Sequence, residues 1–153
     1  MYDCDEVTLA GQPLLYIASE FTEGSTLKEK LAVWKASNQI MPLTEIAALM
    51  KATASALDYA HARGVVHSGL KPDNILFTAQ GEPALTDFSI ASAIKVASQT
   101  LPADPSGAPA YMAPEQVRGD PIDNRADIYA LGVLLYELCT NTPPFTTDTA
   151  VGV

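Results

Sequence analysis

The chain has 153 residues, 48% of them hydrophobic, which is the size of one domain with a buried core. Its formal net charge is -9, from nine basic and eighteen acidic side chains, which argues against a nucleic-acid surface and a patch for anionic membranes. Cys139 stands in an apolar run, where a free cysteine packs as a small hydrophobe, and Cys4 lies far from it. There is no signal-peptide pattern and no apolar run long enough for a membrane span. These features predict a cytoplasmic domain.

The first predicted elements lie between residues 13 and 29. Residues 13–21, PLLYIASEF, are rich in large apolar and aromatic side chains, which is typical of a strand. Glu23 and Gly24 follow as a turn. Thr26 and Glu29 have the spacing of a capping box, in which each side chain accepts from a backbone N–H of the other residue. We therefore expect a helix to begin at this point.

A second helix is predicted from Thr44 onward. Six residues recur at the spacing of one helical face and form an apolar stripe: Ile46, Leu49, Met50, Thr53, Leu57 and Ala60. Gly64 follows at a position typical of the glycine that ends a helix. The pattern indicates an amphipathic helix that packs by one face.

The second half of the chain predicts a hairpin, a long loop and a buried helix. Residues 74–77 and 83–86 are short apolar pieces on either side of Gln80-Gly81, which is typical of a hairpin. Residues 89–109 are rich in Ser, Ala, Pro and Thr and predict a long loop. Residues 127–139 are apolar on nearly every face, so we expect a helix buried on all sides, ended by residues 141–145. The order of elements predicts an α+β domain that is mostly helical.

Polar side chains gather at the two ends of the predicted hairpin. Asn74 precedes one strand and Asp87 follows the other, so antiparallel pairing brings them together, with Lys71 and His67 on the adjoining loop. Carboxylate and amide oxygens beside a lysine suit Mg²⁺ and a phosphate group. Asp and Asn also favour turns for structural reasons alone, and a lone histidine is commonly a core or loop residue. Spacing by itself leaves both interpretations open.

Five motifs in chain order resemble those of the protein kinases. HSGLKPDN (67–74) is similar to the catalytic loop H-R-D-L-K-P-x-N, and DFS (87–89) stands where the family has D-F-G. GAPAYMAPEQ (107–116) resembles the end of the activation segment. DIYALGVLLYEL (127–138) resembles the central helix of the large lobe, and YIASEFTEGSTL (16–27) resembles the strand and hinge that join the lobes. The likeness is to bacterial Ser/Thr protein kinases and extends over nearly the whole chain.

The resemblance implies a protein-kinase-like α+β fold that binds ATP and Mg²⁺. Residues 1–24 would form the end of the small lobe and the hinge, and residues 25–153 a partial large lobe, together spanning 1–153. The implied nucleotide contacts are the hinge residues Glu20, Phe21 and Thr22, Ser19 at the pocket behind them, and Leu76 beneath the adenine ring. Asn74 and Asp87 would hold Mg²⁺, and Lys71 would contact the transferring phosphoryl group.

The resemblance also implies four structural roles. His67 and Phe88 would stack in the core beneath the site. Asp127 would anchor the catalytic loop through its backbone amides. Glu115 would tie the activation segment to a later helix, and its usual arginine partner is not evident, with Arg118 and Arg125 as candidates by proximity.

Departures from the family pattern decide the predicted function. Gly69 stands where the family has its catalytic Asp, and losing a positioned general base costs ~10²- to 10⁴-fold in rate. Ser68 replaces the preceding Arg, so the usual reader of a phosphorylated Ser98 or Thr100 is missing. Ala108 replaces a Thr that bridges the catalytic Asp and Lys. The 153 residues also contain no G-x-G-x-x-G loop and no V-A-I-K lysine strand, and we expect them to begin near the fourth small-lobe strand.

We therefore predict a pseudokinase or kinase fragment that acts through binding, with ATP, Mg²⁺ and a protein partner as possible ligands. The alternative is part of a working Ser/Thr protein kinase, which the retention of Lys71, Asn74 and Asp87 supports. A third interpretation is a remnant without a ligand. Small-molecule phosphotransferases of kinase-like fold share a similar loop but lack the segment ending in YMAPEQ (111–116). The sequence names no substrate, partner or oligomeric state.

Overall fold

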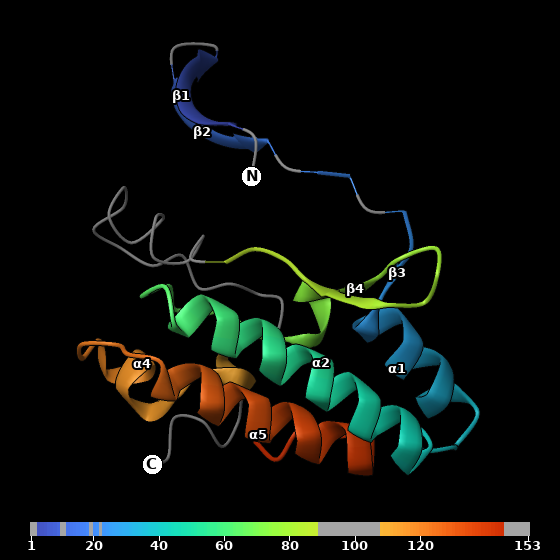
Figure 1. The fold of residues 1–153 in the computed structure, drawn as a ribbon. Helices are drawn as coiled ribbons and strands as arrows, with labels where there is room; N and C mark the ends of the chain where they lie inside the picture. The colour runs from blue at the N-terminus through green and yellow to red at the C-terminus, as the bar shows by residue number, and fades with distance from the viewer. Residues whose placement is uncertain (1–2, 10–11, 19, 22, 89–107, 146–153) are drawn as a thin grey trace.

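Two long helices, α2 (Leu43–His61) and α5 (Arg125–Thr140), pack side by side under a small sheet (Figure 1). The computed structural model describes residues 3–9, 12–18, 20–21, 23–88 and 108–145. The other elements, in chain order, are β1 (Asp3–Leu9), β2 (Gln12–Ala18), β3 (Ser25–Thr26), α1 (Leu27–Ala36), η1 (Pro72–Asn74), β4 (Ile75–Phe77), β5 (Pro83–Leu85), η2 (Ala108–Tyr111) and α4 (Pro114–Arg118).

The strands form two antiparallel sheets. β1 pairs with β2 in a hairpin that an extended connection joins to the rest of the chain (Figure 1). The second sheet has the order β3-β4-β5, with Ser25 opposite Phe77 and Ile75 opposite Leu85. This sheet leads directly into α1, so it fixes where α1 begins relative to the hairpin of β4 and β5.

One apolar core joins α1, α2, β4 and α5. Its most completely buried aliphatic side chains are Leu27, Leu57, Leu70, Ile75, Leu134 and Leu138. Full burial of such a side chain stabilises the fold by about 1.5–3 kcal/mol. Leu70 and Ile75 lie on either side of η1, so the core fixes both ends of this short turn.

The predicted helices and hairpin are confirmed. In α1 the Thr26 hydroxyl accepts from the Glu29 N–H at 3.1 Å, and the Glu29 carboxylate accepts from the Thr26 N–H at 2.9 Å. In α2 the predicted stripe is buried, with Met50 partly so. That helix ends at His61, and Gly64 lies just beyond it with a left-handed φ of 74°.

The structure differs from the sequence expectations in the extent of one strand and in several short elements. The strand predicted over residues 13–21 ends at Ala18, and Phe21 beyond it is 84% exposed. β1, β3 and α4 were not predicted. The loop predicted over 89–109 lies largely outside the described residues, and its last two residues belong to η2.

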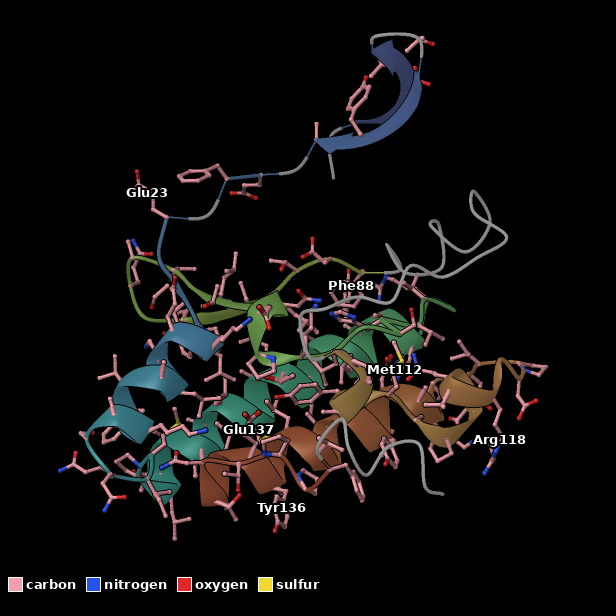
Figure 2. All side chains as sticks on the ribbon, turned by 180° about the vertical axis from the view of Figure 1, so that it is seen from behind. Glu23, Phe88, Met112, Arg118, Tyr136 and Glu137 are labelled. Carbon is pink, nitrogen blue, oxygen red and sulfur yellow. The ribbon has the colours of Figure 1, made fainter. Side chains whose placement is uncertain are left out.

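The expectation that the last helix is buried on all sides is wrong for the described structure. α5 packs one face against α2 and η2, whereas Ile128, Leu135 and Tyr136 are 56%, 41% and 50% exposed and Cys139 is also exposed. Figure 2 shows Tyr136 pointing outward and the neighbouring Glu137 pointing inward. Apolar composition indicates which faces a helix can bury but not whether a neighbour covers them. None of the described helices is long and apolar enough to cross a membrane.

Candidate functional site

The segment HSGLKPDN (67–74) lies between α2, which ends at His61, and β4, which begins at Ile75. Leu70 and Pro72 are buried, and the N–H of Asn74 donates to the carbonyl of Lys71 at 3.0 Å within η1. Two buried apolar side chains and a tight turn thus give the polar residues beside them a defined position. The segment is called the catalytic loop below, after its likeness to that motif.

A single buried carboxylate organises the catalytic loop. Asp127, in the first turn of α5, is 1% exposed. It accepts from the backbone N–H groups of His67 and Ser68 at 2.9 and 2.8 Å. His61, at the end of α2, places its Nε2 2.7 Å from the same carboxylate. The contact that the resemblance implied for Asp127 is therefore present, and it joins α2, the loop and α5.

His67 lies beneath the loop with no exposed surface. Its Nδ1 accepts from the N–H of Gly69 at 3.3 Å, and its ring lies 4.6 Å from that of Phe88 at 40°. Its Nε2 has no hydrogen-bond partner within the described part of the chain. Burial lowers the pKa of His67, and the charge of Asp127 opposes this effect. The ring is therefore neutral at pH 7 and stacks as an apolar group.

The hairpin of β4 and β5 brings Asn74 next to the segment that carries Asp87. The carbonyl of Asn74 accepts from the N–H of Thr86 at 2.9 Å, and Asp87 follows, exposed and with a left-handed φ of 62°. The side-chain Nδ2 of Asn74 donates to the carbonyl of Gly69 at 2.8 Å. This bond turns the amide so that Oδ1 is the atom left for a cation.

These oxygen donors fit Mg²⁺ that shares its coordination with phosphate and water. Mg²⁺ is commonly held by one or two carboxylates together with substrate phosphates. Within the described ranges no group of three or more His, Cys, Asp or Glu side chains is placed to hold a metal ion. An amide oxygen and a carboxylate are donor types that Mg²⁺ can take together with phosphate and water.

Gly69 occupies the centre of the loop without being required by its geometry. Its φ is not among the left-handed ones. A Cβ added there would meet nothing nearer than 3.9 Å, the distance to Asn74 Nδ2 and to His67 Nδ1. The position thus has room for a Cβ, and neither its backbone conformation nor a described neighbour requires a glycine there.

The other predicted ligand residues lie in different surroundings. Leu76, in the middle of β4, is half-buried between Thr26 of β3 and Ala84 of β5. Lys71 is half-buried at the start of η1. Glu20 and Phe21 are exposed on the connection between the sheets. Ser19 and Thr22 lie outside the described residues.

Glu115 does not pair with either candidate arginine. Arg125 forms its ion pair with Asp123 at 2.9 Å, and that interaction is the main cause of the raised pKa of Arg125, to which the charge of Glu115 adds little. Arg118 points outward at the end of α4 (Figure 2). Glu115 is half-buried and forms no ion pair with a residue that the structure describes.

Several contacts were not predicted from the sequence. Gln116 of α4 donates from Nε2 to the carbonyl of Ser68 at 2.8 Å, and Lys28 of α1 pairs with Asp73 at 2.6 Å. Tyr111 of η2 donates to the Glu137 carboxylate. Burial raises the pKa of Glu137, and this hydrogen bond opposes the increase. No sequence pattern links Lys28 to Asp73, which lies far along the chain, and no pattern predicts that the glutamine after A-P-E binds the catalytic loop.

Comparisons with known proteins agree with this geometry. The protein kinase domain family matches residues 7–152. The serine/threonine-protein kinase PknB of Mycobacterium leprae is 36% identical over 154 residues, which cover 100% of this chain and 24% of that protein. The probable serine/threonine-protein kinase PknB of Lactococcus lactis is 39% identical over 140 residues, 90% of this chain and 21% of that protein.

The fold and the site therefore define a domain of the protein kinase type, with helices and a small antiparallel sheet. The chain belongs to the protein kinase family and is similar to the bacterial Ser/Thr protein kinases. It spans about a quarter of the length of these relatives.

Replacing Asp127 tests the anchoring of the loop. Asp127→Ala leaves two backbone N–H groups and His61 without their acceptor, so we expect the free energy of unfolding in urea to fall by roughly 3–5 kcal/mol. Asp58→Ala, on the exposed face of α2, is the control and is expected to change it by less than about 0.5 kcal/mol. Equal effects of the two substitutions would contradict the anchor.

The buried neutral His67 predicts a dependence of stability on pH. Because the pKa of His67 is lower in the folded state than its usual value of about 6.5, the unfolded chain binds the proton more readily. The stabilising contribution of neutral His67 is fully present above a pH of about 6.5 and is lost as the pH falls below that value. We expect His67→Phe to weaken this loss by up to ~1.4 kcal/mol per pH unit, measured by urea unfolding between pH 7.5 and 5.5. Parallel stability curves for the two proteins would show that His67 is not the group concerned.

Proposed function

We propose that this chain is the ATP- and Mg²⁺-binding portion of a protein-kinase domain that acts through binding and has lost efficient phosphotransfer. One observation carries the proposal. The catalytic loop keeps its anchors, Asp127 below and the Asn74–Gly69 bond above, while position 69 supplies no carboxylate. A scaffold for the nucleotide is thus retained without the group that would accept the proton of a substrate hydroxyl.

The residues have separable tasks in this proposal. Asn74 and Asp87 hold Mg²⁺, which neutralises phosphate charge when it is bound. Lys71 contacts the terminal phosphoryl group. Residues 19–22 form a hinge for the adenine, and Leu76 packs beneath it. Residues 1–24 then belong to the small lobe and residues 25–153 to a partial large lobe.

A second candidate is part of a working Ser/Thr protein kinase that transfers the ATP γ-phosphoryl group to protein hydroxyls. The retention of Lys71, Asn74 and Asp87 favours it, as do the names of the similar proteins. Gly69 weighs against it, because no described carboxylate takes the place of the missing one on the loop: Asp73, its nearest carboxylate in sequence, is paired with Lys28.

Nucleotide binding tests the first proposal. At a ligand concentration ten times Kd, binding stabilises the fold by about 1.4 kcal/mol, which raises the Tm of a domain of this size by roughly 3–6 °C. We expect such a shift with ATP and Mg²⁺ in a thermal-shift titration, a smaller shift with ATP alone, and none with Mg²⁺ alone.

Asp87→Ala is expected to remove the Mg²⁺-dependent part of this shift because it deletes a cation ligand. The matched control is Asp120→Ala, an exposed aspartate after α4, which is expected to leave the shift unchanged. No shift of the unsubstituted chain under any condition would overturn the binding proposal.

Phosphotransfer separates the two candidates. We expect no incorporation of phosphate from ATP into a generic protein substrate, for the natural chain or for Gly69→Asp. A Cβ at position 69 meets no close neighbour among the described residues, but these 153 residues carry neither a Gly-rich loop nor a lysine strand to hold the phosphates. Incorporation by the natural chain that Asp87→Ala abolishes would favour the working kinase instead.

A further inference from the structure

The backbone N–H and the backbone carbonyl of Ser68 are each bound by a side chain from a distant element. Its N–H donates to Asp127 of α5 at 2.8 Å, and its carbonyl accepts from Nε2 of Gln116 of α4 at 2.8 Å. Ser68 has a φ of 59°, a left-handed conformation that a residue with a Cβ rarely adopts. Such a conformation persists only where its surroundings fix it.

The chemistry of residue 116 matches both of its contacts. Gln116 is 9% exposed, and its Oε1 accepts from the N–H of Ala113 at 2.9 Å while its Nε2 donates to Ser68. A carboxamide presents an acceptor and a donor side by side at any pH. A glutamate accepts but does not donate when ionised, and a methionine of similar length forms neither strong bond.

The two hydrogen bonds to the backbone of Ser68 are linked through Gly69 to Asn74, the candidate metal ligand. Gly69 follows Ser68, and its carbonyl accepts from Nδ2 of Asn74 at 2.8 Å. The direction of the Gly69 carbonyl depends on the backbone of Ser68, so the orientation of the Asn74 amide depends on it as well. A continuous chain of bonds therefore runs from Ala113 through Gln116, Ser68 and Gly69 to Asn74.

We propose that Gln116 is a positioning residue for the catalytic loop, which ties the segment Pro114–Arg118 to the backbone of Ser68 and thereby sets the side chain of Asn74. The effect on Mg²⁺ and nucleotide rests on the proposed function, whereas the effect on the loop does not. In this arrangement a movement of α4 is transmitted to the side chain of Asn74 through neutral hydrogen bonds, and no charged or modified side chain takes part.

Hydrogen exchange of the full chain, followed residue by residue by NMR, tests the proposal. In Gln116→Glu at pH 7.5 the carboxylate faces the Ser68 carbonyl without a proton to donate. We expect the protection factors of the Ser68 and Gly69 amides to fall about tenfold, as for loss of a buried hydrogen bond, with the core amides of α5 changed less. Near pH 5 we expect partial recovery, because a protonated carboxyl group donates again. The unsubstituted chain at each pH is the reference.

Two further variants keep the outcome decisive if the charge at position 116 disturbs folding. Gln116→Met is expected to show a similar loss of protection at Ser68 and Gly69 with no recovery at low pH, and a displaced side-chain amide signal of Asn74. Gln80→Glu, in the exposed hairpin turn, is the control and is expected to change neither. Natural protection at Ser68 and Gly69 in Gln116→Met, or a loss spread evenly over the core, would overturn the proposal.

A parallel titration with ATP and Mg²⁺ separates this inference from the proposed function. Binding by the natural chain that weakens about tenfold in Gln116→Met, in step with the Asn74 signal, supports both. If the natural chain does not bind, the proposed function is wrong, and the exchange data alone decide the role of Gln116.

Discussion

The carboxylate of Asp127 is the point on which the arrangement of the loop depends. It is buried near the start of α5, where the N-terminal end of the helix favours a negative charge. It accepts from two consecutive backbone amides and contacts His61 of α2. The left-handed Ser68, the buried His67 and the direction of the Gly69 carbonyl all follow from that fixed backbone. Without the acceptor, the two amides would lose their hydrogen-bond partner, so the position of the loop depends on that of the helix.

Local patterns predicted most of the fold because their causes are local. The capping box at Thr26 and the stripe of α2 depend on residues within a few turns, and both are present. The hairpin of β4 and β5 follows from its turn and flanking apolar pieces. β3 could not be predicted, since two residues become a strand only when a distant strand pairs with them. α5 shows the opposite case. Its nearly uniform apolar composition predicted a neighbour on each face, but several of its large apolar side chains are exposed.

The candidate site was predictable as far as it lies on the hairpin. Antiparallel pairing placed Asn74 beside Thr86 and therefore next to Asp87, as expected from spacing. The position of Asp127 came from the family resemblance, since no sequence pattern links residues sixty positions apart. Gln116 gave no signal, because its role depends on the direction of one carbonyl group. Neither arginine named by proximity pairs with Glu115 in the described structure, and Arg125 has a nearer carboxylate two residues before it.

The open space beside Gly69 bears on how such a site changes over evolutionary time. Among the described residues, no atom lies nearer than 3.9 Å to the place that a Cβ would take, so none of them requires a glycine there. Shape and reactivity at this position are therefore independent traits of the loop. A lineage can lose or regain the carboxylate by one substitution while selection on stability acts only on the scaffold around it.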